Sequence, residues 1–175
     1  VYTATFTPSG DGATSVAVAA NAFTDSGGTG NTVSNTFAWT YDGTAPTMTI
    51  TAAVSGSSLN SGSTTNDATI TLTFTSSEAM TGFVLGDIDI SSGSLSALSG
   101  SGDTYTSTFT PSGDVTHTID IDASKFTDAV GNQNTASNAY TWTYDGTNPT
   151  MTITSSGSAN GGASNAAVTL TFTSS

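Results

Sequence analysis

The chain has 175 residues, with 13 acidic side chains, a single Lys or Arg and no Cys, and its formal net charge is −12. Binding to nucleic acid or to an anionic lipid surface requires clustered basic side chains, so this composition argues against both partners. Because disulfides are excluded, stability has to come from packing, which bound metal can supplement. No apolar run reaches the length of a membrane span.

The chain repeats itself at the scale of one small domain. Val1–Asp11 returns as Thr104–Asp114, and Trp39–Thr44 returns as Trp142–Thr147, both at an offset of 103 positions. Later in the repeat the second copy is shortened by five residues within one turn. A period of this length indicates a tandem array of domains rather than the short turns of a solenoid.

The repeat divides the chain into one complete unit and two partial ones. Residues 46–147 form a complete unit, residues 1–45 hold the last strands of a preceding unit, and residues 148–175 hold the first two strands of a following unit. A lone partial unit would expose strand edges and apolar faces, so each needs a partner segment. We expect either an excerpt from a longer array or a protomer whose partial units are completed by neighbouring protomers.

Strands are predicted from alternation of apolar and hydroxyl side chains. Residues 47–51 and 68–75 alternate with period two, which is typical of a strand with one dry and one wet face. About seven short strands in about 100 residues, with no helical periodicity, predict an all-β, two-sheet antiparallel sandwich. The further strands are expected at residues 88–90, 104–110, 118–122 and 139–144. The side chains expected in the core are Met48, Ile50, Ile70, Leu72, Phe74, Tyr105, Phe109, Ile119, Ile121, Tyr140 and Trp142.

The joint between units is short. At residues 41–47 the last strand of one unit leads into the first strand of the next within a few positions. Pro46 fixes its own φ and biases Ala45 towards an extended conformation. Such a joint favours an elongated string of domains over a compact cluster.

The recurring motifs resemble those of a known family. The segments DGTAPTMTIT, LTFTSSE, YTSTFTPSGD, FTDAVGN and WTYDGT are similar to the bacterial immunoglobulin-like repeats of very large surface adhesins and biofilm proteins. The resemblance covers the whole chain, partial units included. It implies tandem immunoglobulin-like sandwiches in a secreted or cell-surface bacterial protein, where such domains serve mainly as spacers.

Four carboxylates are expected to meet at one pole of the complete unit. In an immunoglobulin-like sandwich the loops after the second and sixth strands lie at the pole where the chain enters. Glu78 follows the second strand, Asp87 ends the same connection, Asp128 lies after the sixth strand, and the linker brings Asp42. No basic side chain neutralises them, and Ca²⁺ accepts six to eight such oxygen ligands. We therefore expect a structural calcium ion that stiffens the joint.

The same acids recur one period apart. Asp25 and Asp42 in the first copy match Asp128 and Asp145 in the second, and Asn132 is a further candidate ligand although its counterpart is a threonine. The alternative is that these are solvated loop acids, with an Asx turn at Asp128. The candidate metal ligands are thus Asp42, Glu78, Asp87, Asp128, Asn132, Asp25 and Asp145. Asp11 and Asp114 are interpreted as turn formers, and Asp89, Asp120 and Asp122 as solubility charges.

Catalytic chemistry is not expected. The chain has one His, one Lys and no Arg or Cys, so a serine triad lacks a base, and His117 is best explained as a structural residue. Trp39 and Trp142 are expected in the core rather than on a sugar-stacking platform. The predicted role is a calcium-rigidified extender that contacts neighbouring repeats or protomers. The alternatives are a self-assembling filament subunit and a carbohydrate- or ice-binding module.

Overall fold

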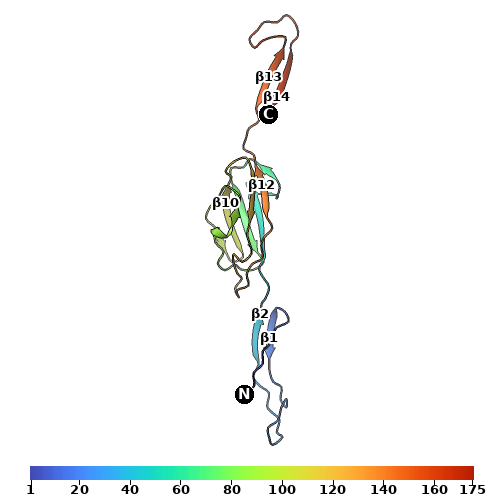
Figure 1. Ribbon diagram of the computed structural model, residues 1–175, viewed down its shortest axis with the longest axis vertical. Coiled ribbons are helices and arrows are strands. Elements are labelled where there is room, and N and C mark those ends of the chain that lie inside the picture. Colours follow the sequence, from blue (N-terminus) through green and yellow to red (C-terminus); the bar gives the residue numbers. More distant parts are fainter.

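The computed structural model describes all 175 residues as three parts that follow one another along the longest axis (Figure 1). An N-terminal hairpin pairs β1 (Gly12–Val16) with β2 (Phe37–Tyr41), and a C-terminal hairpin pairs β13 (Met151–Ser156) with β14 (Thr169–Ser174). Between them, strands β3 to β12 form a sandwich, which we call the central unit. No helix has the length and hydropathy needed to span a bilayer.

The central unit consists of two sheets. The first has the order β4-β3-β6-β10-β8, with β9 also paired to β10, and the second has the order β5-β12-β11-β7. All pairs are antiparallel except β5 with β12. This arrangement confirms the all-β, immunoglobulin-like sandwich. The first sheet contains β3 (Met48–Val54), β4 (Ser57–Leu59), β6 (Ile70–Ser76), β8 (Ser94–Leu95), β9 (Ser99–Ser101) and β10 (Thr104–Thr110). The second contains β5 (Thr64–Thr65), β7 (Asp89–Ile90), β11 (Thr116–Asp120) and β12 (Tyr140–Tyr144).

The core lies between the sheets and follows the predicted alternation. Along β6, the side chains of Ile70, Leu72 and Phe74 are fully buried, whereas the intervening threonines face outward or are half-buried. Trp142 from the second sheet meets Phe109 from the first edge to face, with ring centroids 4.8 Å apart. Apolar side chains of both inner faces thus interdigitate, which is the main stabilising contribution in a fold without disulfides.

His117 is part of this core. Its ring lies 5.1 Å from that of Phe109 and 5.4 Å from that of Trp142, and Nδ1 forms a 2.8 Å hydrogen bond with the hydroxyl of Ser92. The imidazole is completely buried. Its position agrees with a structural role in packing the two sheets together.

Several strand limits differ from the sequence prediction. β11 covers residues 116–120 rather than 118–122, so Ile121 is buried just beyond the strand. The Ser99–Asp103 segment, which precedes the strand expected at residues 104–110, contains β9, and β9 forms a hairpin with β10. Gly100 makes this hairpin possible, because its φ is +126° and a Cβ there would lie 2.3 Å from the carbonyl oxygen of Thr104. The short strands β4, β5 and β8 and the 3₁₀ turn η1 (Leu85–Asp87) were not predicted.

The two terminal hairpins keep the registers of their counterparts in the central unit. Thr14 pairs with Trp39 as His117 pairs with Trp142. Met151 pairs with Ser174 as Met48 pairs with Ser76. Each hairpin is therefore a correctly registered piece of the sandwich, although neither faces a second sheet.

Candidate metal centre

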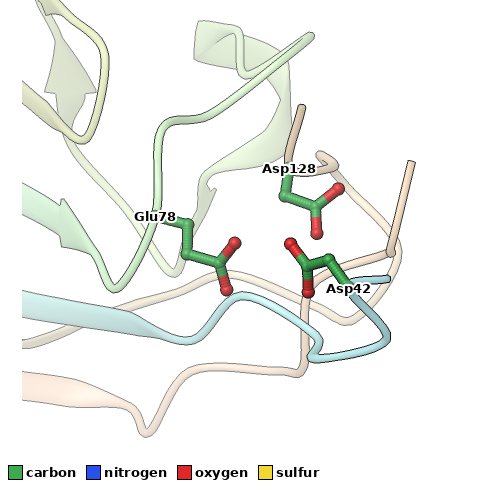
Figure 2. Close-up of side chains that lie close together, drawn as sticks. All are labelled: Asp42, Glu78 and Asp128. Atoms are coloured by element: carbon green, nitrogen blue, oxygen red, sulfur yellow. The ribbon is translucent and has the colours of Figure 1, made fainter. Parts of the chain in front are cut away.

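Three carboxylates meet where the N-terminal linker enters the central unit. Asp42 lies in the linker between β2 and β3, Glu78 lies two residues after the end of β6, and Asp128 lies in the loop between β11 and β12. One carboxylate oxygen from each lies within 4.8 Å of the others. Figure 2 shows the three side chains directed towards a common space. This placement agrees with the expectation from the sequence that these three carboxylates meet at the pole where the chain enters the central unit.

The Asp128 loop is a tight turn built around its carboxylate. Oδ1 accepts hydrogen bonds from the backbone N–H groups of Val130, Gly131 and Asn132, at 2.9, 2.7 and 2.9 Å. Oδ2 accepts one from Nδ2 of Asn132 at 2.8 Å. Asp128 is only 3 % exposed, and burial acts to raise its pKa, but these hydrogen bonds outweigh burial and hold the pKa below its usual value. The carboxylate is therefore held in its charged form next to Glu78 and Asp42.

Backbone contacts fix the three segments that carry these acids. Thr81 and Thr127 exchange two backbone hydrogen bonds, which join the Glu78 segment to the Asp128 loop. Asn132 Nδ2 also donates to the backbone carbonyl of Asp42 at 3.2 Å, which ties the loop to the linker. Pro46 is buried, and its carbonyl accepts from Thr135 N–H at 3.0 Å. The linker thus lies against the central unit instead of leaving it freely.

Asp11, which precedes β1 of the N-terminal hairpin, also holds the linker through its carboxylate. Oδ1 of Asp11 accepts from Gly43 N–H at 2.7 Å, and Oδ2 accepts from the hydroxyl of Thr44. Asp114 makes the same two contacts one period later, with Gly146 N–H at 2.8 Å and the hydroxyl of Thr147. We call each arrangement a linker latch. The interpretation of Asp11 and Asp114 as simple turn formers was thus incomplete, because both carboxylates bind the residues that follow the last strand.

The latches also lower the pKa of the two carboxylates that form them. Hydrogen bonds from Thr44 and Gly43 lower the pKa of Asp11, and hydrogen bonds from Thr147 and Gly146 lower the pKa of Asp114. Sequence reasoning could have found the latch, because the PSGD and DGT motifs recur together at the same offset. Neither motif alone indicates its partner.

The electrostatics of the cluster favour a cation. Burial raises the pKa of Glu78, and the charges of Asp42, Asp128 and Asp11 raise it further. Lys125 is the only Lys or Arg in the chain, so at most one basic side chain could offset the negative charge of the three acids. A set of carboxylate oxygens under mutual repulsion matches the ligand preference of a hard divalent cation such as Ca²⁺.

The central unit resembles a known family of domains. Residues 42–144 match the family model described as bacterial Ig-like domain. The chain belongs to the bacterial Ig-like domain family. Domains of this family are typically found in bacterial surface or extracellular proteins. Comparisons with curated proteins and with solved structures found no match.

Of the remaining candidate ligands of this bacterial Ig-like chain, Asp87, Asp25 and Asp145 do not join the cluster, whereas Asn132 contacts two of its members. Asp87 belongs to the 3₁₀ turn, where Oδ2 accepts from Val84 N–H at 2.8 Å. Asn132 directs its amide nitrogen, a hydrogen-bond donor, at Asp128 and Asp42. Asp25 caps its own loop by accepting from Gly27 and Thr29 N–H, and Asp145 accepts from Thr147 N–H. Neither Asp25 nor Asp145 lies in a group of three acids.

A second acidic group lies elsewhere on the bacterial Ig-like domain. Asp89 and Asp120 are direct partners across β7 and β11, and Asp122 lies close to both, with one oxygen of each within 4.8 Å of the others. The three side chains are exposed or half-buried. Sequence reasoning interpreted them as solubility charges but missed that they lie together, because the pairing of β7 with β11 was not predicted.

Proposed function

We propose that this bacterial Ig-like chain is a structural extender of an extracellular adhesin or surface fibre, and that Ca²⁺ stiffens its joints. Membership of the family supports a role as an Ig-like module of a surface protein. The extender role is supported by the linear sequence of three parts in Figure 1 and by the short linkers between them.

The observation that carries the calcium proposal is the origin of the three carboxylates. Asp42 comes from the linker, whereas Glu78 and Asp128 come from two different loops of the central unit. A cation held by these three residues would connect the linker to both loops and would neutralise their repulsion. This chain would supply the negative oxygens and the preformed Asp128 loop, and the ion would supply the cross-link.

The linker latches support stiffness independently of any ion. Asp11 and Asp114 each hold the Gly-Thr pair that leaves the preceding sheet, so both linkers start in a fixed direction. Catalysis is not part of the proposal. The one Ser–His pair, Ser92 with His117, has an imidazole that is completely buried between the two sheets.

The test compares thermal melting and small-angle X-ray scattering in Ca²⁺ and in EGTA. We expect Ca²⁺ to raise the melting temperature of the central unit and to narrow the distribution of maximum dimensions, because bending at the first joint is reduced. Calorimetric titration should give a dissociation constant in the range of about 10⁻⁴ to 10⁻³ M that is usual for extracellular calcium modules. Identical melting and scattering in the two buffers would contradict the calcium proposal, and a compact particle in both would contradict the extender role.

A matched pair of variants identifies the site. Asp42 and Asp145 occupy the same position in the repeated YDGT motif, but only Asp42 has acidic partners. Asp42→Asn should therefore remove most of the calcium-dependent rise in melting temperature, whereas Asp145→Asn should preserve it. Equal losses in both variants would show that the ion binds elsewhere.

A further inference from the structure

We propose that the central unit resists tension along its long axis, because the two strands that carry its linkers are loaded in shear. This inference rests on the proposed role as an extender, since an extender transmits force from one linker to the other. Figure 1 shows the linkers leaving the central unit at opposite ends of the long axis, with the strands between them running along that axis. The first linker leads into β3 and the second follows β12, so a pull on the chain acts on these two strands.

The first loaded strand is β3. It pairs with β6 through six consecutive residues, from Met48 to Ala53. A pull on the first linker is directed along β3, so the hydrogen bonds of these pairs share the load instead of opening one after another. Met48, Ile50 and Ala52 are buried and have to leave the core in the same step, which adds to the resistance.

The second loaded strand is β12, and a parallel ladder connects it to the N-terminal part of the chain. Residues 61–65, which include β5, lie beside residues 141–145, which include β12. β12 is pulled towards the second linker, whereas β5 is connected to the first linker through β4 and β3. Once β3 moves, β5 and β12 are therefore pulled in opposite directions along their axes. Parallel strands loaded in this way slide past each other, so the bonds between them are strained together.

Hydrogen bonds join the two segments of this ladder, which we call the shear clamp. The backbone N–H groups of Gly62, Thr143 and Asp145 donate across it at 2.7, 2.9 and 3.0 Å. Thr141 N–H donates to the hydroxyl oxygen of Ser61 at 3.1 Å. Because these bonds share the load, the breaking of a single bond is not enough to separate the segments.

The other edge strands lie outside the path of force from β3 to β12. β8 and β9 pair with β10, β7 pairs with β11, and none of these strands is attached to a linker. β5 is equally short, but it is the edge strand that contacts the last strand of the unit. The shear clamp therefore gives β5 a mechanical role that β7, β8 and β9 do not share.

The test measures lifetimes of the folded central unit under constant force, with handles attached at pairs of introduced cysteines in a chain that has none of its own. Thr47→Cys with Asn148→Cys pulls through the two linkers and loads β3 and the clamp in shear. Asn66→Cys with Asn148→Cys pulls apart the neighbouring ends of β5 and β12, so the clamp opens bond by bond. All three positions are exposed. At the same force, we expect the lifetime in the first arrangement to be more than about tenfold longer, because several bonds have to break together. Equal lifetimes would overturn the proposal.

A matched pair of serine variants tests the clamp within the first pulling arrangement. Ser61→Ala removes the hydroxyl that accepts from Thr141 N–H in the clamp. Ser91→Ala removes the same kind of bond outside the path of force, where the hydroxyl accepts from Thr118 N–H at 2.9 Å. Ser61→Ala should shorten the lifetime under force by roughly two- to tenfold, whereas Ser91→Ala should leave it unchanged. Equal shortening by both variants would show that rupture follows overall stability, which thermal melting of each variant measures separately, and would contradict the clamp.

The outcome can be separated from that of the proposed function. All force measurements are made in EGTA, so they do not depend on a bound ion. If the two pulling directions give equal lifetimes while small-angle scattering shows an extended chain, the extender role stands and the shear clamp is wrong. If scattering shows a compact chain while the two lifetimes differ as expected, the clamp stands and the extender role is wrong.

Discussion

The central unit and the terminal hairpins show what one sequence pattern specifies by itself and what needs a second sheet. β14 has the same alternation and the same register as β6, yet Phe172 is exposed where Phe74 is fully buried. Pattern and pairing are local properties of a hairpin, because side chains alternate and the register follows from the strand sequences. Burial is a property of the complete sandwich, and most of the stabilisation comes with it.

The two joints between the parts share one feature and differ in another. Both contain a linker latch, since Asp11 and Asp114 bind equivalent Gly-Thr pairs. Only the first joint leads into a complete unit, and only there do three carboxylates meet. The latch is thus formed by neighbouring turns of one sheet, whereas the carboxylate cluster requires two loops of the next domain.

Removing the central tryptophan is the strongest way to test the first contrast. Trp142→Ala should destabilise the central unit by about 3–5 kcal/mol, because a large, completely buried side chain is lost and a cavity remains. Trp39→Ala changes the equivalent residue of the N-terminal hairpin, which is half-buried and faces no second sheet. It should leave the unfolding free energy of the central unit unchanged within about 0.5 kcal/mol.

Both free energies are measured by urea denaturation at a concentration where the chain is monomeric. A large effect of Trp39→Ala under that condition would mean that the N-terminal hairpin unfolds together with the central unit. The distinction between a self-sufficient sandwich and dependent hairpins would then be wrong.

How far the fold could be predicted depends on strand length. β6 and β10 have seven residues each, and their alternation was enough to predict both strands and the inward positions of Leu72 and Phe109. β5 and β8 have two residues each and carry no periodic signal, whereas β7 lies within the strand that was expected at residues 88–90. β5 and β8 were not predicted. Their positions are decided by the strands they pair with, such as β12 for β5. The short edge strands β5 and β8 are therefore a result of tertiary structure and could not be predicted from their own residues.

The residues of the candidate site that could be predicted are those whose position follows from the strand order alone. Asp42, Glu78 and Asp128 follow or precede strands whose ends lie at one pole, so knowledge of the strand order was sufficient. Asp87 comes from the same connection as Glu78 but is used by a 3₁₀ turn, which the sequence did not indicate. The contact of Asp11 with Gly43 crosses 32 positions and depends on how two turns lie beside each other.

The linker latches should make stability depend on pH, with a smaller effect than that of removing Trp142. The pKa of Asp114 is lowered by its hydrogen bonds, so the stability from this latch is present above the unfolded value near 3.8 and is lost as the pH falls through the lower folded value. Asp114→Asn should reduce the melting temperature modestly at neutral pH and flatten its decline in acid. Melting curves recorded from neutral pH to about pH 2 would show this.

Asp11→Asn provides the matched comparison at the first joint. It removes the equivalent latch, but it also removes a charge that raises the pKa of Glu78. Glu78 affects stability in the opposite direction. Its pKa is raised in the folded state, so ionising Glu78 at a pH above its usual pKa near 4.5 lowers the stability of the fold when no cation is bound. In EGTA the two effects oppose each other, so Asp11→Asn should reduce the melting temperature less than Asp114→Asn does. Equal losses would indicate that the carboxylates at the first joint interact too weakly to matter.

The smallest effect is expected for Asp89→Asn, which changes the second acidic group, Asp89, Asp120 and Asp122. Asp89, Asp120 and Asp122 also have one oxygen each within 4.8 Å of the others, but none of them is buried and none comes from a linker. Asp89→Asn should raise stability by no more than about 0.5 kcal/mol at low salt, because water already screens most of the repulsion. The gain should disappear at high ionic strength and be the same in Ca²⁺ and EGTA. If Asp89→Asn instead lowered the melting temperature only in Ca²⁺, the strand group would be a cation site in its own right. Closeness of three carboxylates would then be sufficient for binding, and the burial and interdomain position of the first group would not be what distinguishes it.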